Sequence, residues 1–99
     1  MYLMHTHTTE DITVKNIAST IVRMCWQYDQ LLKSITRCTR EDSLMKRYQA
    51  INEIEDTTIM LIAYAKKIAR TSAEQHTINC MVKRYNRVMC DKRDAIINN

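Results

Sequence analysis

Glycine, proline and phenylalanine are all absent from this chain of 99 residues. Average usage predicts about seven glycines and about five prolines at this length. Without glycine, every residue that adopts a positive φ angle carries a steric cost, which disfavours tight β-hairpins and glycine-rich phosphate loops. A helical protein with short polar connections manages most easily without both residues, so the composition predicts an all-α protein.

Long apolar runs are also absent. The longest uncharged one, residues 57–65, has about half the length that a membrane span needs. The N-terminal sequence turns polar at position 5, so no secretory signal is predicted and we expect an intracellular protein, cytoplasmic or nuclear. A formal charge of +4 makes the chain mildly basic. That charge permits nucleic acid or an acidic protein as a partner without requiring either.

The four cysteines predict neither a disulfide framework nor a metal site. Cys80 and Cys90 are separated by about 15 Å of helical rise and cannot bond to each other. Cys25 and Cys38 fall at inward positions of a predicted helix, where they are interpreted as small apolar core residues. No Cys or His spacing matches a zinc knuckle, so no metal or other cofactor is predicted.

Residues 1–9 are predicted to form a flexible leader and residues 10–99 a single domain. The first helix is expected to begin near Thr8 or Thr9. Its apolar residues follow an unbroken heptad of alternating steps of three and four, as in a coiled coil. These residues are Val14, Ile17, Ile21, Met24, Tyr28, Leu31 and Ile35. Ala18, Cys25 and Leu32 widen the seam to the stripe typical of a bundle helix.

Two further helices are predicted after a polar break at residues 36–43. Asp42 or Ser43 is expected to cap the second helix, which runs from about 43 to 70. Its inward residues are Leu44, Tyr48, Ile51, Ile54, Leu61, Ile62, Ala65, Ile68 and Ala69. Ser72 and Gln75 form a candidate capping box for the third helix, which runs to about 97. Its inward residues are Ile78, Met81, Val82, Tyr85, Val88, Met89, Ala95 and Ile96.

Short connections make sequential helices antiparallel neighbours, so the predicted fold is an up-down-up three-helix bundle. One alternative stays open, because nothing in residues 36–43 forbids a helix. The first two helices could then fuse into a long helical hairpin that completes its core by dimerising.

Apolar residues at outward positions are the strongest indication of function. Trp26 lies about 120° from the centre of its seam, and the stretch from Ile59 to Ala65 is apolar on every side of its helix. We expect one patch, formed by Val22, Trp26, Ile59, Met60, Ala63 and Tyr64. It predicts a non-enzymatic protein–protein interaction module, a homodimer that also engages a target protein, unless the leader folds back over the patch.

Two other functions are kept as alternatives. Basic residues on the second and third helices could contact nucleic acid: Lys66, Lys67, Arg70, Lys83, Arg84 and Arg87. Asp91 and Asp94 on the same face favour a solvated, salt-paired surface instead.

Charged and polar residues predicted inside the bundle could hold a small anion in an all-helical enzyme: Arg47, Glu55, Lys92 and Tyr28. A partly buried salt bridge is the simpler interpretation, and an enzyme is the minor hypothesis. The composition also suits a small effector encoded by a virus or a mobile element.

Overall fold

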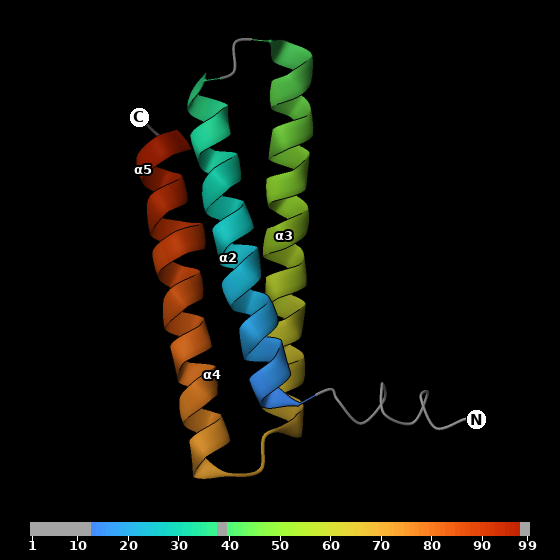
Figure 1. The fold of residues 1–99 in the computed structure, drawn as a ribbon, viewed down its shortest axis with the longest axis vertical. Helices are drawn as coiled ribbons and strands as arrows, with labels where there is room; N and C mark the ends of the chain where they lie inside the picture. The colour runs from blue at the N-terminus through green and yellow to red at the C-terminus, as the bar shows by residue number, and fades with distance from the viewer. Residues whose placement is uncertain (1–12, 38–39, 98–99) are drawn as a thin grey trace, which may run out of the picture.

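The protein is a three-helix bundle, as predicted (Figure 1). A computed structural model describes residues 13–37 and 40–97. Helix α2 (Val14–Arg37) runs up, α3 (Glu41–Ile68) runs down, and α4 (Ser72–Tyr85) runs up again. The last helix continues through a π-helical segment, η1 (Asn86–Lys92), into α5 (Arg93–Ile97). The predicted leader, residues 1–9, lies outside the described residues.

Helix α2 is capped at its start by Thr13, whose hydroxyl accepts from the backbone N–H of Asn16 over 3.1 Å. Thr8 and Thr9, the predicted caps, lie outside the described residues. None of the helices that the structure describes is both long enough and apolar enough to cross a membrane.

The connection between α2 and α3 rules out the fused helical hairpin. Arg40 has extended backbone angles, φ −90° and ψ 126°, and is the N-cap of α3. Asp42 and Ser43 were predicted to cap this helix, but both lie inside its first turn. No side chain caps the first turn of α3. The carboxylates of Glu41 and Asp42 in that turn interact favourably with the positive end of the helix dipole.

A capping box starts α4, one residue earlier than predicted. The Thr71 hydroxyl accepts from the Glu74 N–H over 3.1 Å, and the Glu74 carboxylate accepts from the Thr71 N–H over 3.1 Å. The Ser72 and Gln75 pair has the same spacing, but the carboxylate makes the stronger, charge-assisted bond. That carboxylate also accepts from the Arg70 N–H over 2.9 Å, and these bonds lower the pKa of Glu74.

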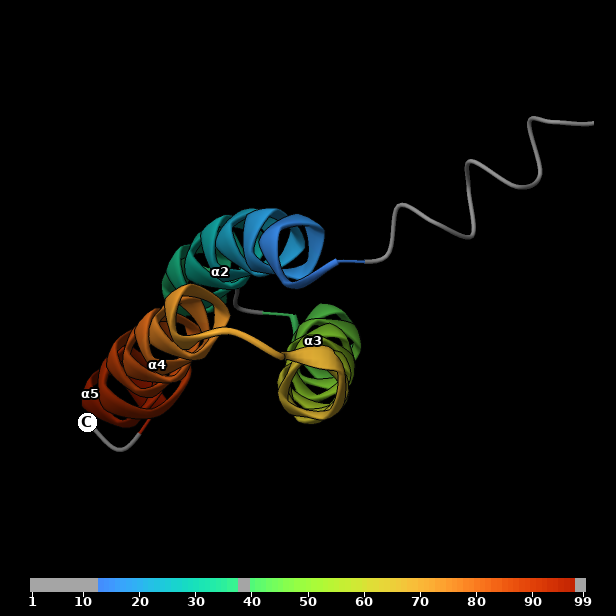
Figure 2. The ribbon, with the colours of Figure 1, turned by 90° about the horizontal axis from the view of Figure 1, so that it is seen from below.

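One apolar cluster lies between the three helices, which form a triangle in cross-section (Figure 2). Its buried members include Ile21 and Leu32 of α2, Ile51 of α3 and Ile78 of α4, all at predicted inward positions. Thr58 is also buried, and its hydroxyl donates to the Ile54 carbonyl over 2.8 Å. The side chains of two residues predicted inward, Cys38 and Ile96, lie outside the described residues.

The π-helical segment η1 changes which residues face inward near the C-terminus. A turn closed by i→i+5 bonds holds one extra residue, so later side chains are displaced by about 100° from an α-helical wheel. Val88 and Met89, both predicted inward, are buried within the segment itself. Lys92 was predicted inward but its side chain is 50% exposed, and Ala95 is exposed as well.

The capping box gives a direct test of where α4 begins. Thr71→Ala should lower the free energy of unfolding by about 1 kcal/mol, because the Glu74 N–H loses its acceptor. Urea denaturation would measure this, and thermal melting should show a decrease of about 4–8 °C. Ser72→Ala is the matched control and should change stability by less than about 0.5 kcal/mol. An equal loss in both variants would contradict the cap at Thr71.

Candidate partner-binding surfaces

Every apolar residue predicted to bind a partner is exposed. Trp26 is 65% exposed and Met60 70%, values far outside the range of core residues. Val22, Ile59, Ala63 and Tyr64 are exposed as well. Met45 on α3, at 68%, belongs to the same class and was not predicted. The position of Met45 on the outer flank of the second predicted helix is the signal that could have predicted its exposure.

The structure does not bring these residues into the single patch expected from the sequence. Val22 lines a groove between α2 and α4, together with Arg84. Ile59 and Ala63 line a different groove, between α3 and α4, together with Tyr85. The two grooves lie on opposite flanks of α4, because the flank of α2 that carries Val22 faces α4 and not α3.

The first of these regions, which we call the α2–α4 surface, consists of Val22, Trp26, Cys80, Arg84 and Arg87. The groove at its centre has a volume of about 120 Å³. Trp26 follows Val22 by four residues and therefore lies on the same flank of α2. Burial raises the pKa of the neighbouring Cys25 thiol, and the nearby guanidinium groups of Arg84 and Arg87 partly oppose that rise.

Two arginines therefore border the α2–α4 surface on the side of α4 and η1. Beyond Trp26, the Asp29 carboxylate lies 3.0 Å from the Lys92 ammonium and 3.3 Å from that of Lys33. Hydrogen bonds from both lysines hold the pKa of Asp29 below its usual value. This carboxylate is paired with two lysines, while Arg84 and Arg87 add positive charge near Cys25.

The groove between α3 and α4 is larger and mainly apolar. It has a volume of about 280 Å³ and is lined by Ile59, Ile62, Ala63, Lys66, Val82, Tyr85 and Asn86. An adjoining groove of about 490 Å³ also includes Lys66 and Val82, and adds Lys83. In that groove the Cys80 sulfur lies 3.8 Å from Nε2 of His76.

The basic residues predicted to contact nucleic acid are divided between these regions. Lys66 and Lys83 line one groove, whereas Arg84 lines the groove on the other flank of α4. Lys67 and Arg70 are exposed at the C-terminal end of α3 and line neither groove. The structure therefore does not arrange the six residues along one phosphate-contacting line.

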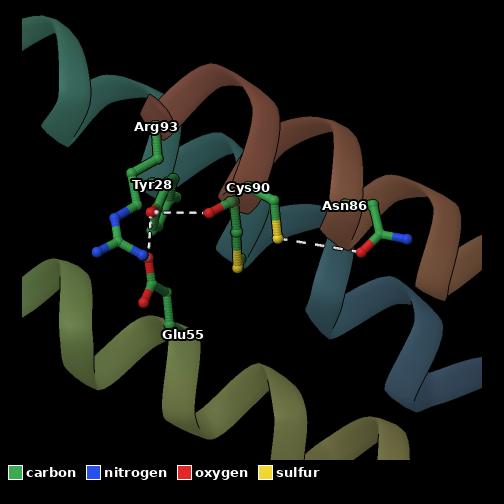
Figure 3. Close-up of polar contacts among 6 residues, drawn as sticks. Tyr28, Glu55, Asn86, Cys90 and Arg93 are labelled. Atoms are coloured by element: carbon green, nitrogen blue, oxygen red, sulfur yellow. Dashed lines mark hydrogen bonds and ion pairs between the residues drawn. The ribbon is translucent and has the colours of Figure 1, made fainter. Parts of the chain in front are cut away.

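Only two of the four residues predicted to form a core anion site meet. The Tyr28 hydroxyl donates to Glu55 and also contacts the Met89 carbonyl at 3.3 Å (Figure 3). The guanidinium of Arg93, which sequence reasoning missed, lies 3.4 Å from the Glu55 carboxylate. The displacement caused by η1 turns Arg93 inward, and no feature of the local sequence predicts that displacement.

The other two residues of that set point elsewhere. Arg47 donates to the Ser34 hydroxyl over 3.0 Å and to the Ser43 carbonyl over 3.3 Å. Lys92 binds Asp29 instead of Glu55. Because Tyr28 is completely buried and Glu55 is already paired with a cation, this cluster joins helices rather than offering positive charge to an anion.

The described residues include no cluster suited to a metal ion. Within residues 13–37 and 40–97, no three His, Cys, Asp or Glu side chains lie close enough to hold a metal ion. Cys80 and Cys90 are both free thiols, as their spacing predicted, and Cys25 is free and buried. The Cys90 thiol lies 4.0 Å from Oδ1 of Asn86 on the side of η1 shown in Figure 3.

Comparisons with known protein families, with curated proteins and with solved structures found no match to this chain. Function is therefore inferred from the geometry of these surfaces.

The buried Tyr28 hydroxyl predicts how stability depends on alkaline pH. Burial, then the bond to Glu55 and its negative charge, raise the pKa of Tyr28 far above 10.0, its value in an unfolded chain. The stabilisation is complete below pH 10 and is lost as pH rises further, because only the unfolded state then releases the proton. The slope is about 1.4 kcal/mol per pH unit.

Tyr28→Phe should remove the contribution of Tyr28 to the fall in the free energy of unfolding between pH 10 and 11. Urea denaturation at each pH would measure this. At pH 7 the variant should be less stable by about 1–2 kcal/mol, because Glu55 and the Met89 carbonyl lose a donor. Tyr85, whose pKa is also raised by burial, supplies a residual slope in both proteins. Parallel pH profiles for the variant and the parent protein would contradict the assignment.

Proposed function

We propose that the protein is a non-enzymatic interaction module that binds an acidic amphipathic helix of a target protein on the α2–α4 surface. The observation that carries this proposal is the exposure of Trp26, 65%, beside Val22, 47%, on the flank that faces α4. Tryptophan at the centre of an apolar region is the side chain most often found as an interface hot spot.

The shape and charge of the surface favour a helix as the partner. Val22 and Trp26 stand one turn apart, and a shallow groove runs beside them between two parallel helices. An amphipathic helix placed there would set its apolar stripe on these two residues. Arg84 and Arg87 on the α4 side favour carboxylates along the flank of that partner helix.

The apolar contribution is large for a domain of this size. Covering the exposed part of a tryptophan removes about 150 Å² from water, which is worth about 4 kcal/mol before entropic costs. A whole domain is stabilised by about 5–15 kcal/mol. An intracellular location, cytoplasmic or nuclear, and an origin in a virus or mobile element remain parts of this proposal that rest on the sequence alone.

Trp26 is the only tryptophan of the chain, so its fluorescence reports directly on the surface. The probe is a synthetic helical peptide with leucines along one face and glutamates on its flanks. We expect it to shift Trp26 emission to shorter wavelength and to bind at least about tenfold tighter than the same peptide with lysines in place of the glutamates.

Two variants locate the binding site. Val22→Asp should weaken binding of the acidic peptide about thirtyfold, equivalent to about 2 kcal/mol. Met45→Ala is the matched control, because Met45 is as exposed as Trp26 but lies on α3. It should bind like the parent protein. Equal affinity for the acidic and the lysine peptides, or an unaffected Val22→Asp variant, would overturn the proposal.

Nucleic acid is the second candidate, and one observation favours it. An exposed aromatic ring with two arginines nearby is also how a single strand is bound, by stacking and phosphate contacts. A thymidine oligonucleotide should then quench Trp26 emission with an affinity that falls steeply with salt. Tighter binding of that oligonucleotide than of the acidic peptide would replace the first proposal with this one.

A further inference from the structure

The outer face of α3 carries a second heptad stripe opposite the buried face of the same helix. Its members are separated by alternating steps of three and four residues, and all are exposed: Glu53, Asp56, Met60, Ala63 and Lys67. On a helical wheel their mean direction lies about 180° from that of the buried residues Ile51, Thr58, Ile62 and Ala65. Met60 and Ala63 form an apolar centre at the middle of this stripe, between charged residues, and apolar residues gathered on an exposed helix face favour association.

The two ends of this stripe carry opposite charges on either side of its apolar centre. Acidic Glu53 and Asp56 come before Met60, and basic Lys67 comes after Ala63. When two copies of α3 lie antiparallel about a twofold axis between Met60 and Ala63, each Asp56 falls opposite Lys67 of the second copy. A parallel pair would place Asp56 against Asp56 and Lys67 against Lys67, which is repulsive.

We propose that the protein forms a homodimer in which two α3 helices pack antiparallel through Met60 and Ala63, with Asp56 of each copy opposite Lys67 of the other. Twofold symmetry forms each ion pair twice. In the same register Glu53 falls opposite Arg70 of the second copy, and Arg70 lies just beyond the end of α3.

The exposure of the stripe fits this arrangement. Met60 is 70% exposed, and its neighbours Ile59 and Tyr64 are 50% and 44% exposed, so apolar area is available at the centre. The small side chain of Ala63 lets two helix axes approach to about 8 Å. Within the described part of the chain, no salt bridge engages Asp56 or Lys67, so both charges are available to a second copy.

The paired α3 surface is separate from the α2–α4 surface. The groove beside Val22 is lined by α2 and α4 residues alone. A dimer through α3 therefore leaves Trp26 exposed on both copies, and the assembly presents two target sites. This inference does not depend on the identity of the target or on the proposed function.

Sedimentation equilibrium in reducing, low-salt buffer tests the pairing through charge reversal. The parent protein should be a dimer. Asp56→Lys places a lysine opposite Lys67 twice in each dimer, and Lys67→Glu places a glutamate opposite Asp56 twice. Each substitution should raise the dissociation constant of the dimer at least about tenfold. The double variant D56K/K67E restores opposite charges and should return to within about threefold of the parent value.

Mixing provides a second readout of the register. The two single variants, each dissociated alone, should form a heterodimer when combined in equal amounts, because both cross-pairs then have opposite charge. Lys46→Glu is the matched control. It reverses a charge on the same stripe, beyond the end of the partner helix in this register, and should leave the dissociation constant unchanged.

Four outcomes would overturn the proposal, three from the dimer measurements and one from a Trp26 variant. The first is a parent protein that stays monomeric at about 100 μM, and the second is a dimer that the single reversals do not weaken. The third is a double variant that stays dissociated, which would exclude the antiparallel register. None of these results affects the peptide titration of Trp26. Trp26→Ala should retain the dimer, and its dissociation would mean that the copies pair through α2 and α4 instead.

Discussion

The buried hydroxyl of Tyr28 is the constraint on which the arrangement of the three helices depends. It belongs to α2, donates to Glu55 of α3, and lies 3.3 Å from the Met89 carbonyl of η1 (Figure 3). A polar group removed from water must be hydrogen-bonded, or the cost is several kcal/mol. A shift of any helix along its neighbours would break one of these contacts, so this side chain determines the register of the whole bundle.

Glu55 in turn explains the irregular turn in the last helix. Its carboxylate is largely shielded from water, with 14% of the side chain exposed, and a carboxylate there needs a cation as well as the tyrosine. The π-helical segment η1 turns Arg93 toward it. In a continuous α-helix Arg93 would lie about 100° away, and Lys92 would take its place. The irregularity thus completes the polar cluster and releases Lys92 to bind Asp29 on the α2 side.

Within residues 13–37 and 40–97, the same three-helix packing leaves two outward apolar faces exposed. A helix in a triangle of three contacts its neighbours over about half of its circumference, so apolar residues elsewhere stay in water. Trp26 and Val22 on α2 face away from Met60 and Ala63 on α3, because α4 and not α3 covers that flank of α2. We propose the first surface for a target helix and the second for another copy of the chain.

The sequence alone determined the fold class, the burial of most core residues and the identity of most exposed apolar residues, Met45 excepted. Heptad spacing is local, and a helix with an apolar stripe must bury that stripe whatever lies against it. Ile21, Ile51 and Ile78 were predictable for this reason. Only the tertiary structure decided which neighbouring helix covers each flank of a helix. It also decided where the last helix holds the extra residue of η1. The predicted patch is divided into two surfaces, and Arg93 takes the place of Lys92 beside Glu55. Both results depend on contacts between different helices, which periodicity along one helix does not encode.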